Sequence, residues 1–136
     1  MNPRNAMAQY RSVQSRGAVI DASPTRLIQL ALEQLLAQLT MARGCMERIQ
    51  SRRQVRDVVD KGEAVRKVNG LLGELAAALD LERGAEIAQN LLALYSYMMT
   101  RLTAANLNND VLIVDEISRL VCEIKTAWDQ VVASGA

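Results

Sequence analysis

Few side chains in this 136-residue sequence are of the types that do catalytic or metal chemistry. There is no histidine, and the two cysteines, Cys45 and Cys122, lie far apart in the chain. Structural zinc sites need several nitrogen or sulfur ligands, and histidine is the most frequent proton carrier of enzymes. Asp115 and Glu116 fall in the first turns of a predicted helix, where carboxylates complement the helix dipole. We therefore expect no enzyme activity, no metal or cofactor and no small-molecule substrate, and we expect both cysteines to be buried apolar residues.

One row of side chains has the spacing of a contact with another chain. It consists of Asn90, Leu94, Tyr97 and Arg101. Intervals of four and three residues place the row along one side of a helix. Polar groups at the edge of an apolar stripe indicate contacts with a partner backbone; the alternative is a hydrogen bond between two helices of the same bundle. Met98 lies beside the row, and its flexible thioether could adapt to a partner or fill the core.

The apolar pattern predicts four helices that position these side chains. The chain is rich in leucine and alanine and contains no phenylalanine, a composition that favours helices over strands. We expect helices over residues 24–49, 55–79, 85–105 and 111–132, joined by turns at 50–53, 80–84 and 106–109. Ser23 and Pro24 form a helix start, and Asp110 is the predicted N-cap of the last helix. Short turns make neighbours antiparallel, so the expected fold is an all-α, antiparallel up-down four-helix bundle over residues 23–136, preceded by a loosely held N-terminal arm over residues 1–22.

The arm is polar and shows little periodicity. It lacks the apolar segment of a signal peptide, and the longest apolar runs of the chain are far shorter than the roughly 20 residues that cross a bilayer. We therefore expect no membrane insertion. Tyr10 is the candidate anchor that docks the arm onto the bundle; the alternative is a local contact with the start of the first helix.

The predicted helices carry more apolar surface than a single core needs. In the helix over 85–105 the expected core residues are Ile87, Leu91, Leu94, Met98, Leu102 and Ala105, and Leu92, Tyr95 and Met99 widen this stripe. In the helix over 24–49 the residues outside the main stripe are Leu27, Leu30, Leu32, Leu36 and Met41. Such a surplus predicts a groove for a partner helix, and the alternative is an ordinary core with its flanks. Tyr95 and Trp128 are expected in the core.

The helix over 55–79 contains three glycines, Gly62, Gly70 and Gly73. They lower its stability and could allow a neighbouring helix to approach closely. In the same helix, Asp57 and Lys61 have the spacing of a favourable ion pair.

Charge is distributed unevenly, although the net charge is only +1. Residues 1–56 hold nine arginines and three acidic residues, whereas residues 57–136 hold seven basic and twelve acidic residues. A basic face could bind nucleic acid, but no aromatic side chains alternate with these arginines. We therefore expect a solvated basic surface and no nucleic-acid partner.

Several segments of the sequence resemble the signature of the flagellar secretion chaperone (FliS) family. In the third predicted helix they are Ala85-Glu86-Ile87-Ala88-Gln89-Asn90-Leu91, Leu94-Tyr95-Ser96-Tyr97-Met98, Arg101-Leu102 and Ala105-Asn106, followed by Asp110. Elsewhere they are Tyr10, Ser23-Pro24, Leu27-Ile28, Glu74-Leu75, Leu79-Asp80, Glu116-Ile117 and Ala127-Trp128. The resemblance covers about residues 10–130 and rests on the combination of these segments.

The resemblance implies an antiparallel four-helix bundle with an N-terminal arm, and a cytoplasmic export chaperone. Such a chaperone binds the disordered C-terminal segment of flagellin, prevents premature polymerisation and supports delivery to the flagellar type III export apparatus. In the family, the arm can cover part of the flagellin site. The partner-binding residues that we expect are Tyr10, Asn90, Leu94, Tyr97, Met98 and Arg101.

The sequence departs from the family pattern in the first helix, where Leu32 and Gln34 replace a tyrosine and a glycine. This departure could alter the shape of the groove. The surplus apolar surface is also compatible with another class of function, a small helical adaptor or self-associating bundle for another amphipathic partner.

Overall fold

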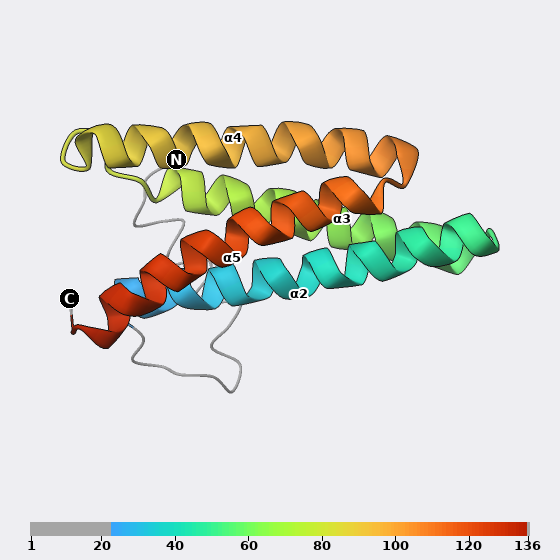
Figure 1. Cartoon of the computed structure of the whole chain (residues 1–136), viewed down its shortest axis with the longest axis horizontal. Helices are drawn as coiled ribbons and strands as arrows, with labels where there is room; N and C mark the ends of the chain where they lie inside the picture. Colours follow the sequence, from blue (N-terminus) through green and yellow to red (C-terminus); the bar gives the residue numbers. More distant parts are fainter. Residues whose placement is uncertain (1–22, 136) are drawn as a thin grey trace.

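The computed structural model describes residues 23–135, which form four helices (Figure 1). The helices are α2 (Pro24–Ser51), α3 (Val55–Ala77), α4 (Ala85–Asn108) and α5 (Val111–Ala133). These bounds lie within three residues of the predicted ones at every helix end. The described residues contain no strand, and the predicted all-α class is confirmed.

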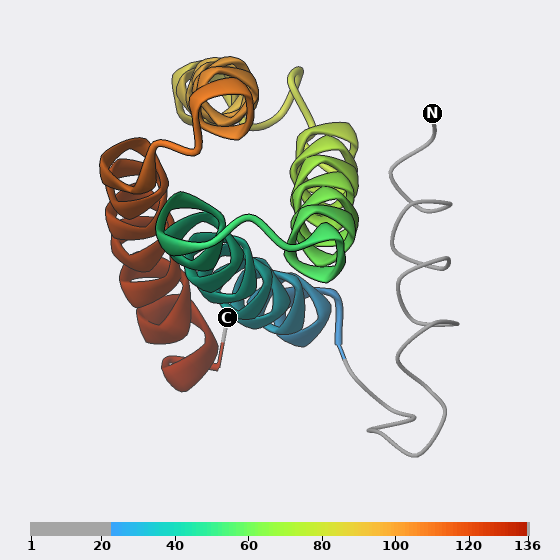
Figure 2. The ribbon, with the colours of Figure 1, turned by 90° about the vertical axis from the view of Figure 1, so that its right-hand side faces the viewer.

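The helices pack as a bundle in which consecutive helices run antiparallel (Figure 1). α2 packs against α3 and α5, and α4 packs against the same two helices from the other side. Seen along the bundle, α2 and α4 therefore occupy opposite corners (Figure 2). All four helices contribute to the core, whose largest fully buried side chains are Leu32, Leu35, Leu39, Met46, Leu72, Met98, Leu102 and Ile117.

Two predicted helix starts are confirmed by their capping hydrogen bonds. The side chain of Ser23 accepts a hydrogen bond from the backbone N–H of Arg26 at 3.2 Å, and Pro24 occupies the first helical position. The side chain of Asp110 accepts from the backbone N–H groups of Leu112 and Ile113 at 3.1 and 3.3 Å. These caps satisfy N–H groups that have no partner inside the helix.

The predicted turn at residues 106–109 starts too early, because α4 continues to Asn108 and only Asn109 of this range lies in the turn. Asn109 ends the helix in the left-handed conformation, with φ 51°, which asparagine adopts more readily than most residues. Nζ of Lys61 donates to the carbonyl oxygen of Asn106 at 3.0 Å and to Oδ1 of Asn109 at 2.8 Å. Nε2 of Gln50 donates to the carbonyl oxygen of Asn109 at 2.6 Å. The α2–α3 hairpin thus holds the turn between α4 and α5.

Two expectations for α3 are also wrong. Asp57 accepts a hydrogen bond from Nε of Arg48 at 2.9 Å, so it pairs across the hairpin rather than with Lys61. The three glycines Gly62, Gly70 and Gly73 do not bring helices together, because a Cβ added to any of them would meet no atom within 4 Å. They lie on the exposed side of α3.

The buried face of α2 is wider than its sequence pattern predicts. Leu27 and Leu32 were expected outside the core, yet they are 5 % and 0 % exposed. Because α2 packs more extensively against α3 and α5 than α4 does, its buried face extends to both flanks. Leu30 and Leu36 are partly buried, and of the expected surplus only Met41 is exposed, at 53 %.

The two cysteines have different environments. Cys45 is buried, as expected, whereas the prediction for Cys122 is wrong because its side chain is exposed. Cys122 follows Val121, which is fully buried, and the next residue of a helix lies 100° further around the axis.

Candidate partner-binding pocket

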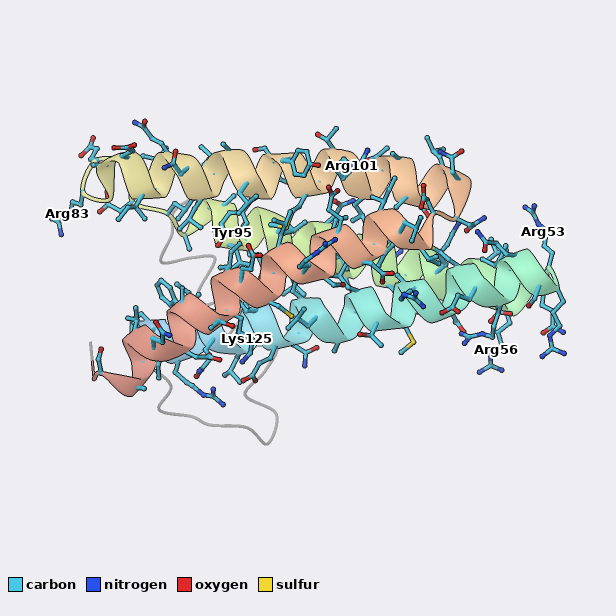
Figure 3. All side chains as sticks on the ribbon, in the orientation of Figure 1. Arg53, Arg56, Arg83, Tyr95, Arg101 and Lys125 are labelled. Carbon is cyan, nitrogen blue, oxygen red and sulfur yellow. The ribbon has the colours of Figure 1, made fainter. Side chains whose placement is uncertain are left out.

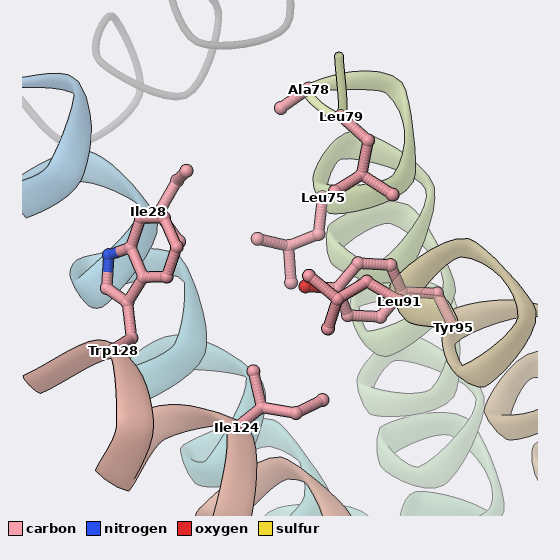
Figure 4. A pocket seen from close by; sticks show the side chains of 8 residues that line it. All are labelled: Ile28, Leu75, Ala78, Leu79, Leu91, Tyr95, Ile124 and Trp128. Carbon is pink, nitrogen blue, oxygen red and sulfur yellow. The ribbon is translucent and has the colours of Figure 1, made fainter. Parts of the chain in front are cut away.

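An apolar pocket lies at the end of the bundle where α2 and α4 begin and where α3 and α5 end (Figure 4). All four helices contribute to its lining, which consists of Ile28, Leu75, Ala78, Leu79, Leu91, Tyr95, Ile124 and Trp128. The apolar stripes of the helices run to this end, and within residues 23–135 no further element covers them there. A concave apolar surface of this kind can bury the side chains of a bound chain.

Tyr95 places a polar atom in this pocket. Its ring is buried, and Figure 4 shows its hydroxyl pointing inward from the α4 side. Burial raises the pKa of Tyr95 to about 12, and the protonated phenol can donate a hydrogen bond. Among residues 23–135 the hydroxyl has no hydrogen-bond partner, and it can therefore fix one polar group of a bound chain.

Trp128 forms the opposite wall of the pocket, next to Ile28 (Figure 4). The prediction of a core position is confirmed for Tyr95, which is 3 % exposed, whereas Trp128 is partly buried and packs against the core from its edge. Trp128 lies in the last turns of α5, at the end of the bundle, and its ring lines the pocket.

The flank of α4 that faces α5 carries the predicted polar row. The hydroxyl of Tyr97 donates to Oε2 of Glu116 at 3.0 Å, and Nε of Arg101 donates to Oε1 of the same carboxylate at 3.1 Å. The pKa of Glu116 is lowered, first by the hydrogen bond from Arg101 and then by that from Tyr97. Of the two interpretations of this row, the structure therefore supports hydrogen bonds between helices of the bundle for Tyr97 and Arg101.

The same flank continues as an apolar edge toward the start of α4. Leu94 is partly buried and Asn90 is exposed. Ile87, two helical turns before Leu94 on the same side of the helix, is 73 % exposed, so the expectation of a core position is wrong. Leu91, between them, lines the pocket. The pocket therefore continues along this flank through Leu91, and we call the flank residues Ile87, Asn90, Leu91 and Leu94 the α4 edge.

The five predicted site residues that the structure describes divide into three groups. Asn90 and Leu94 lie on the α4 edge, and Tyr97 and Arg101 lie beyond its end, bound to Glu116. Met98 is 0 % exposed and belongs to the core. Tyr10 lies outside the described residues.

Sequence reasoning missed the part of the pocket that α3 and the end of α5 supply. The spacing within α3 or α5 alone does not show that Leu75, Leu79 and Ile124 meet in one pocket. The interpretation of Glu116 as a helix-dipole residue does not reveal its partners on α4. The available signal was that the apolar stripes reach the same end of an antiparallel bundle.

Within residues 23–135, no helix is both long and apolar enough to span a bilayer.

Comparison with known proteins relates nearly the whole chain to one family. The family model described as "Flagellar protein FliS" matches residues 6–135. The flagellar secretion chaperone FliSB of Pseudomonas aeruginosa is 45 % identical over 129 residues, which cover 95 % of this chain and 97 % of that protein. The flagellar secretion chaperone FliS of Salmonella typhimurium is 39 % identical over 132 residues, covering 96 % and 93 %. The FliS of Escherichia coli is 35 % identical over 122 residues, covering 89 % and 85 %.

Proposed function

This chain belongs to the FliS family of flagellar secretion chaperones, and we propose that it binds the disordered C-terminal segment of flagellin in the pocket and along the α4 edge. In this proposal the bound segment becomes helical and is kept from premature polymerisation. The chaperone acts in the cytoplasm and delivers the subunit to the flagellar type III export apparatus.

The observation that carries the proposal is the continuity of the pocket with the α4 edge. A segment that folds on binding loses roughly 2–5 kcal/mol or more to ordering, and it recovers this by burying apolar area at ~25 cal/mol per Å². One small pocket would bury too little, whereas a pocket continued by Leu94 and the exposed Ile87 offers an extended contact. The exposed amide of Asn90 and the hydroxyl of Tyr95 supply polar groups for the bound backbone.

The first test compares full-length flagellin with flagellin that lacks its C-terminal segment, by isothermal titration calorimetry. We expect binding of the full-length protein with a negative heat-capacity change, because apolar surface is buried, and no binding of the truncated protein. Equal affinity for both proteins would contradict the proposal.

The second test locates the binding surface with two exposed apolar residues. Ile87→Ser removes a side chain of the α4 edge, and Met41→Ser removes one that is 53 % exposed on α2. We expect Ile87→Ser to weaken flagellin binding about tenfold, in the range of an interface anchor. Met41→Ser is the matched control and should leave the affinity unchanged. An equal effect of both variants would place the client elsewhere.

The N-terminal arm gives a third test of the same proposal. Tyr10 is the proposed anchor of an arm that covers part of the client surface. Deletion of residues 1–18, or Tyr10→Ala in the full chain, should then tighten flagellin binding. Unchanged affinity in both variants would remove the covering role and leave the binding of flagellin itself intact.

A further inference from the structure

The end of the bundle opposite to the pocket carries a surface of different chemistry. It is the tip of the α2–α3 hairpin, residues 48–61, which we call the hairpin tip. This segment holds five basic and two acidic residues. Figure 3 shows Arg53 and Arg56 at this end of the molecule and Arg83 at the other.

Three arginines of the hairpin tip form no strong ion pair with residues 23–135. Among residues 23–135, no carboxylate lies within ion-pair distance of Arg52 or Arg53. Arg56 lies 3.8 Å from Asp60, but its side chain is 90 % exposed, and such surface pairs contribute little. By contrast, Arg48 is engaged with Asp57. Within residues 23–135, three guanidinium groups are therefore left available to a partner.

Two valines are exposed among these arginines. Val55 is 80 % exposed and Val59 is 54 % exposed. They are four residues apart in α3, so they lie on the same side of the helix, with Arg56 between them in sequence. An apolar pair bordered by arginines combines two features of protein interfaces, apolar contact area and guanidinium groups.

We propose that the hairpin tip is a second docking surface, and that it binds an acidic amphipathic helix of a protein partner. Carboxylates of that helix pair with Arg52, Arg53 and Arg56, because guanidinium groups bind carboxylates through two parallel hydrogen bonds. Aliphatic side chains of the helix cover Val55 and Val59. The hairpin tip contains no aromatic residue on which nucleotides would stack, and it lacks the large apolar residues typical of a membrane-binding face.

The hairpin tip and the pocket can be occupied at the same time. Val55 and the pocket residue Leu75 lie near opposite ends of α3, about 30 Å apart at a rise of 1.5 Å per residue. A partner at the hairpin tip therefore does not compete with a chain in the pocket. Binding of a partner to the hairpin tip of the free chain is a readout that does not involve flagellin.

The test uses a synthetic helical peptide of about 18 residues, with leucine at intervals of three and four and glutamate on both flanks. Binding to the full chain is measured by fluorescence anisotropy, in the absence and presence of saturating flagellin. We expect binding that flagellin leaves unchanged and that added salt weakens. The variant Arg52→Glu/Arg53→Glu/Arg56→Glu should weaken it more than tenfold, and Val55→Ser/Val59→Ser should weaken it about tenfold.

Arg83→Glu, a charge reversal at the other end of the bundle, is the control and should leave the affinity unchanged. Circular dichroism checks that every variant keeps its helical content. Failure of the peptide to bind, displacement of the peptide by flagellin, or equal binding to the triple variant would overturn the proposal. Tighter binding of the full chain to phosphatidylglycerol vesicles or to single-stranded RNA than to the peptide would also overturn the proposal. It would assign the hairpin tip to that ligand instead.

Discussion

The indole nitrogen Nε1 of Trp128 lies 2.8 Å from the carbonyl oxygen of Thr25, to which it donates a hydrogen bond across 103 residues of sequence. The bond joins the last turns of α5 to the first turn of α2, at the wall of the pocket. Trp128→Phe keeps an aromatic wall but removes the donor, so we expect it to lower the free energy of unfolding by about 1 kcal/mol. Trp128→Ala should cost more, because it also removes packing area. Urea denaturation of the three proteins measures both effects, and equal stability of wild type and Trp128→Phe would show that the bond contributes nothing.

Trp128 is also the only tryptophan of the chain, which makes it a reporter of the pocket. If a chain enters the pocket, the half-buried indole loses contact with water. We therefore expect its fluorescence maximum to shift to shorter wavelength when a tryptophan-free peptide from the flagellin C-terminus is added. The shift should be absent for the same peptide with its leucines replaced by serine. Tight binding without any spectral change would place the peptide outside the pocket.

The carboxylate of Glu116 predicts a dependence of stability on pH. Hydrogen bonds from Arg101 and then Tyr97 lower its pKa from the ordinary value of 4.5. A carboxyl group with a lowered pKa in the folded state stabilises the fold above pH 4.5, and this contribution is lost as the pH falls through the folded-state pKa. Glu116→Gln should therefore be less stable than wild type at neutral pH, and the two proteins should converge on acidification.

Urea denaturation across a series of pH values below 7 checks this prediction. Glu123→Gln is the control, because it removes an exposed carboxyl group that forms no ion pair within residues 23–135. Parallel curves for wild type and Glu116→Gln at all pH values would contradict the assigned hydrogen bonds.

The positions of the helices could be predicted from the sequence because their signals are local. Ser23 and Asp110 cap the helices that follow them, and the spacing of leucines marks each buried side. The errors concern how extensively each helix packs against its neighbours. Leu27 and Leu32 are buried because α2 packs more extensively against α3 and α5 than α4 does, whereas Ile87 is exposed at the first turn of α4 although it continues the same stripe.

The candidate site could be predicted only in part, for a related reason. The α4 edge follows from one helix, so Asn90 and Leu94 could be placed on it from their spacing alone. The pocket depends on how the ends of four helices meet, which no single helix encodes. The partner of Tyr97 and Arg101 was missed because Glu116 lies on another helix, and its distance from them depends on the crossing of α4 and α5.

The turn between α4 and α5 gives a prediction about Asn109. Its φ of 51° favours glycine or asparagine, and its Oδ1 accepts the hydrogen bond from Lys61. Asn109→Gly keeps the conformation accessible and loses only the bond, at a cost of about 1 kcal/mol. Asn109→Ala loses the bond and adds left-handed strain of about 1 kcal/mol more. Thermal unfolding should rank the stabilities as wild type, then the glycine variant, then the alanine variant; equal stability of the two variants would argue against strain at this position.

The exposed glycines of α3 give the last prediction. Gly62, Gly70 and Gly73 lie in a helix interior, where glycine is less favourable than alanine by up to ~1 kcal/mol, and none has an atom within 4 Å of an added Cβ. Each change to alanine should therefore raise the free energy of unfolding, and the triple variant should gain roughly 2–3 kcal/mol. Gly84→Ala is the contrasting control, because its added Cβ would lie 2.6 Å from Cβ of Ala88 and 2.8 Å from the carbonyl oxygen of Asp80. Gly84→Ala should destabilise the protein, and urea denaturation measures the free energy of unfolding of all these variants. A loss of stability in the triple variant would mean that the exposed side of α3 is covered in the folded protein.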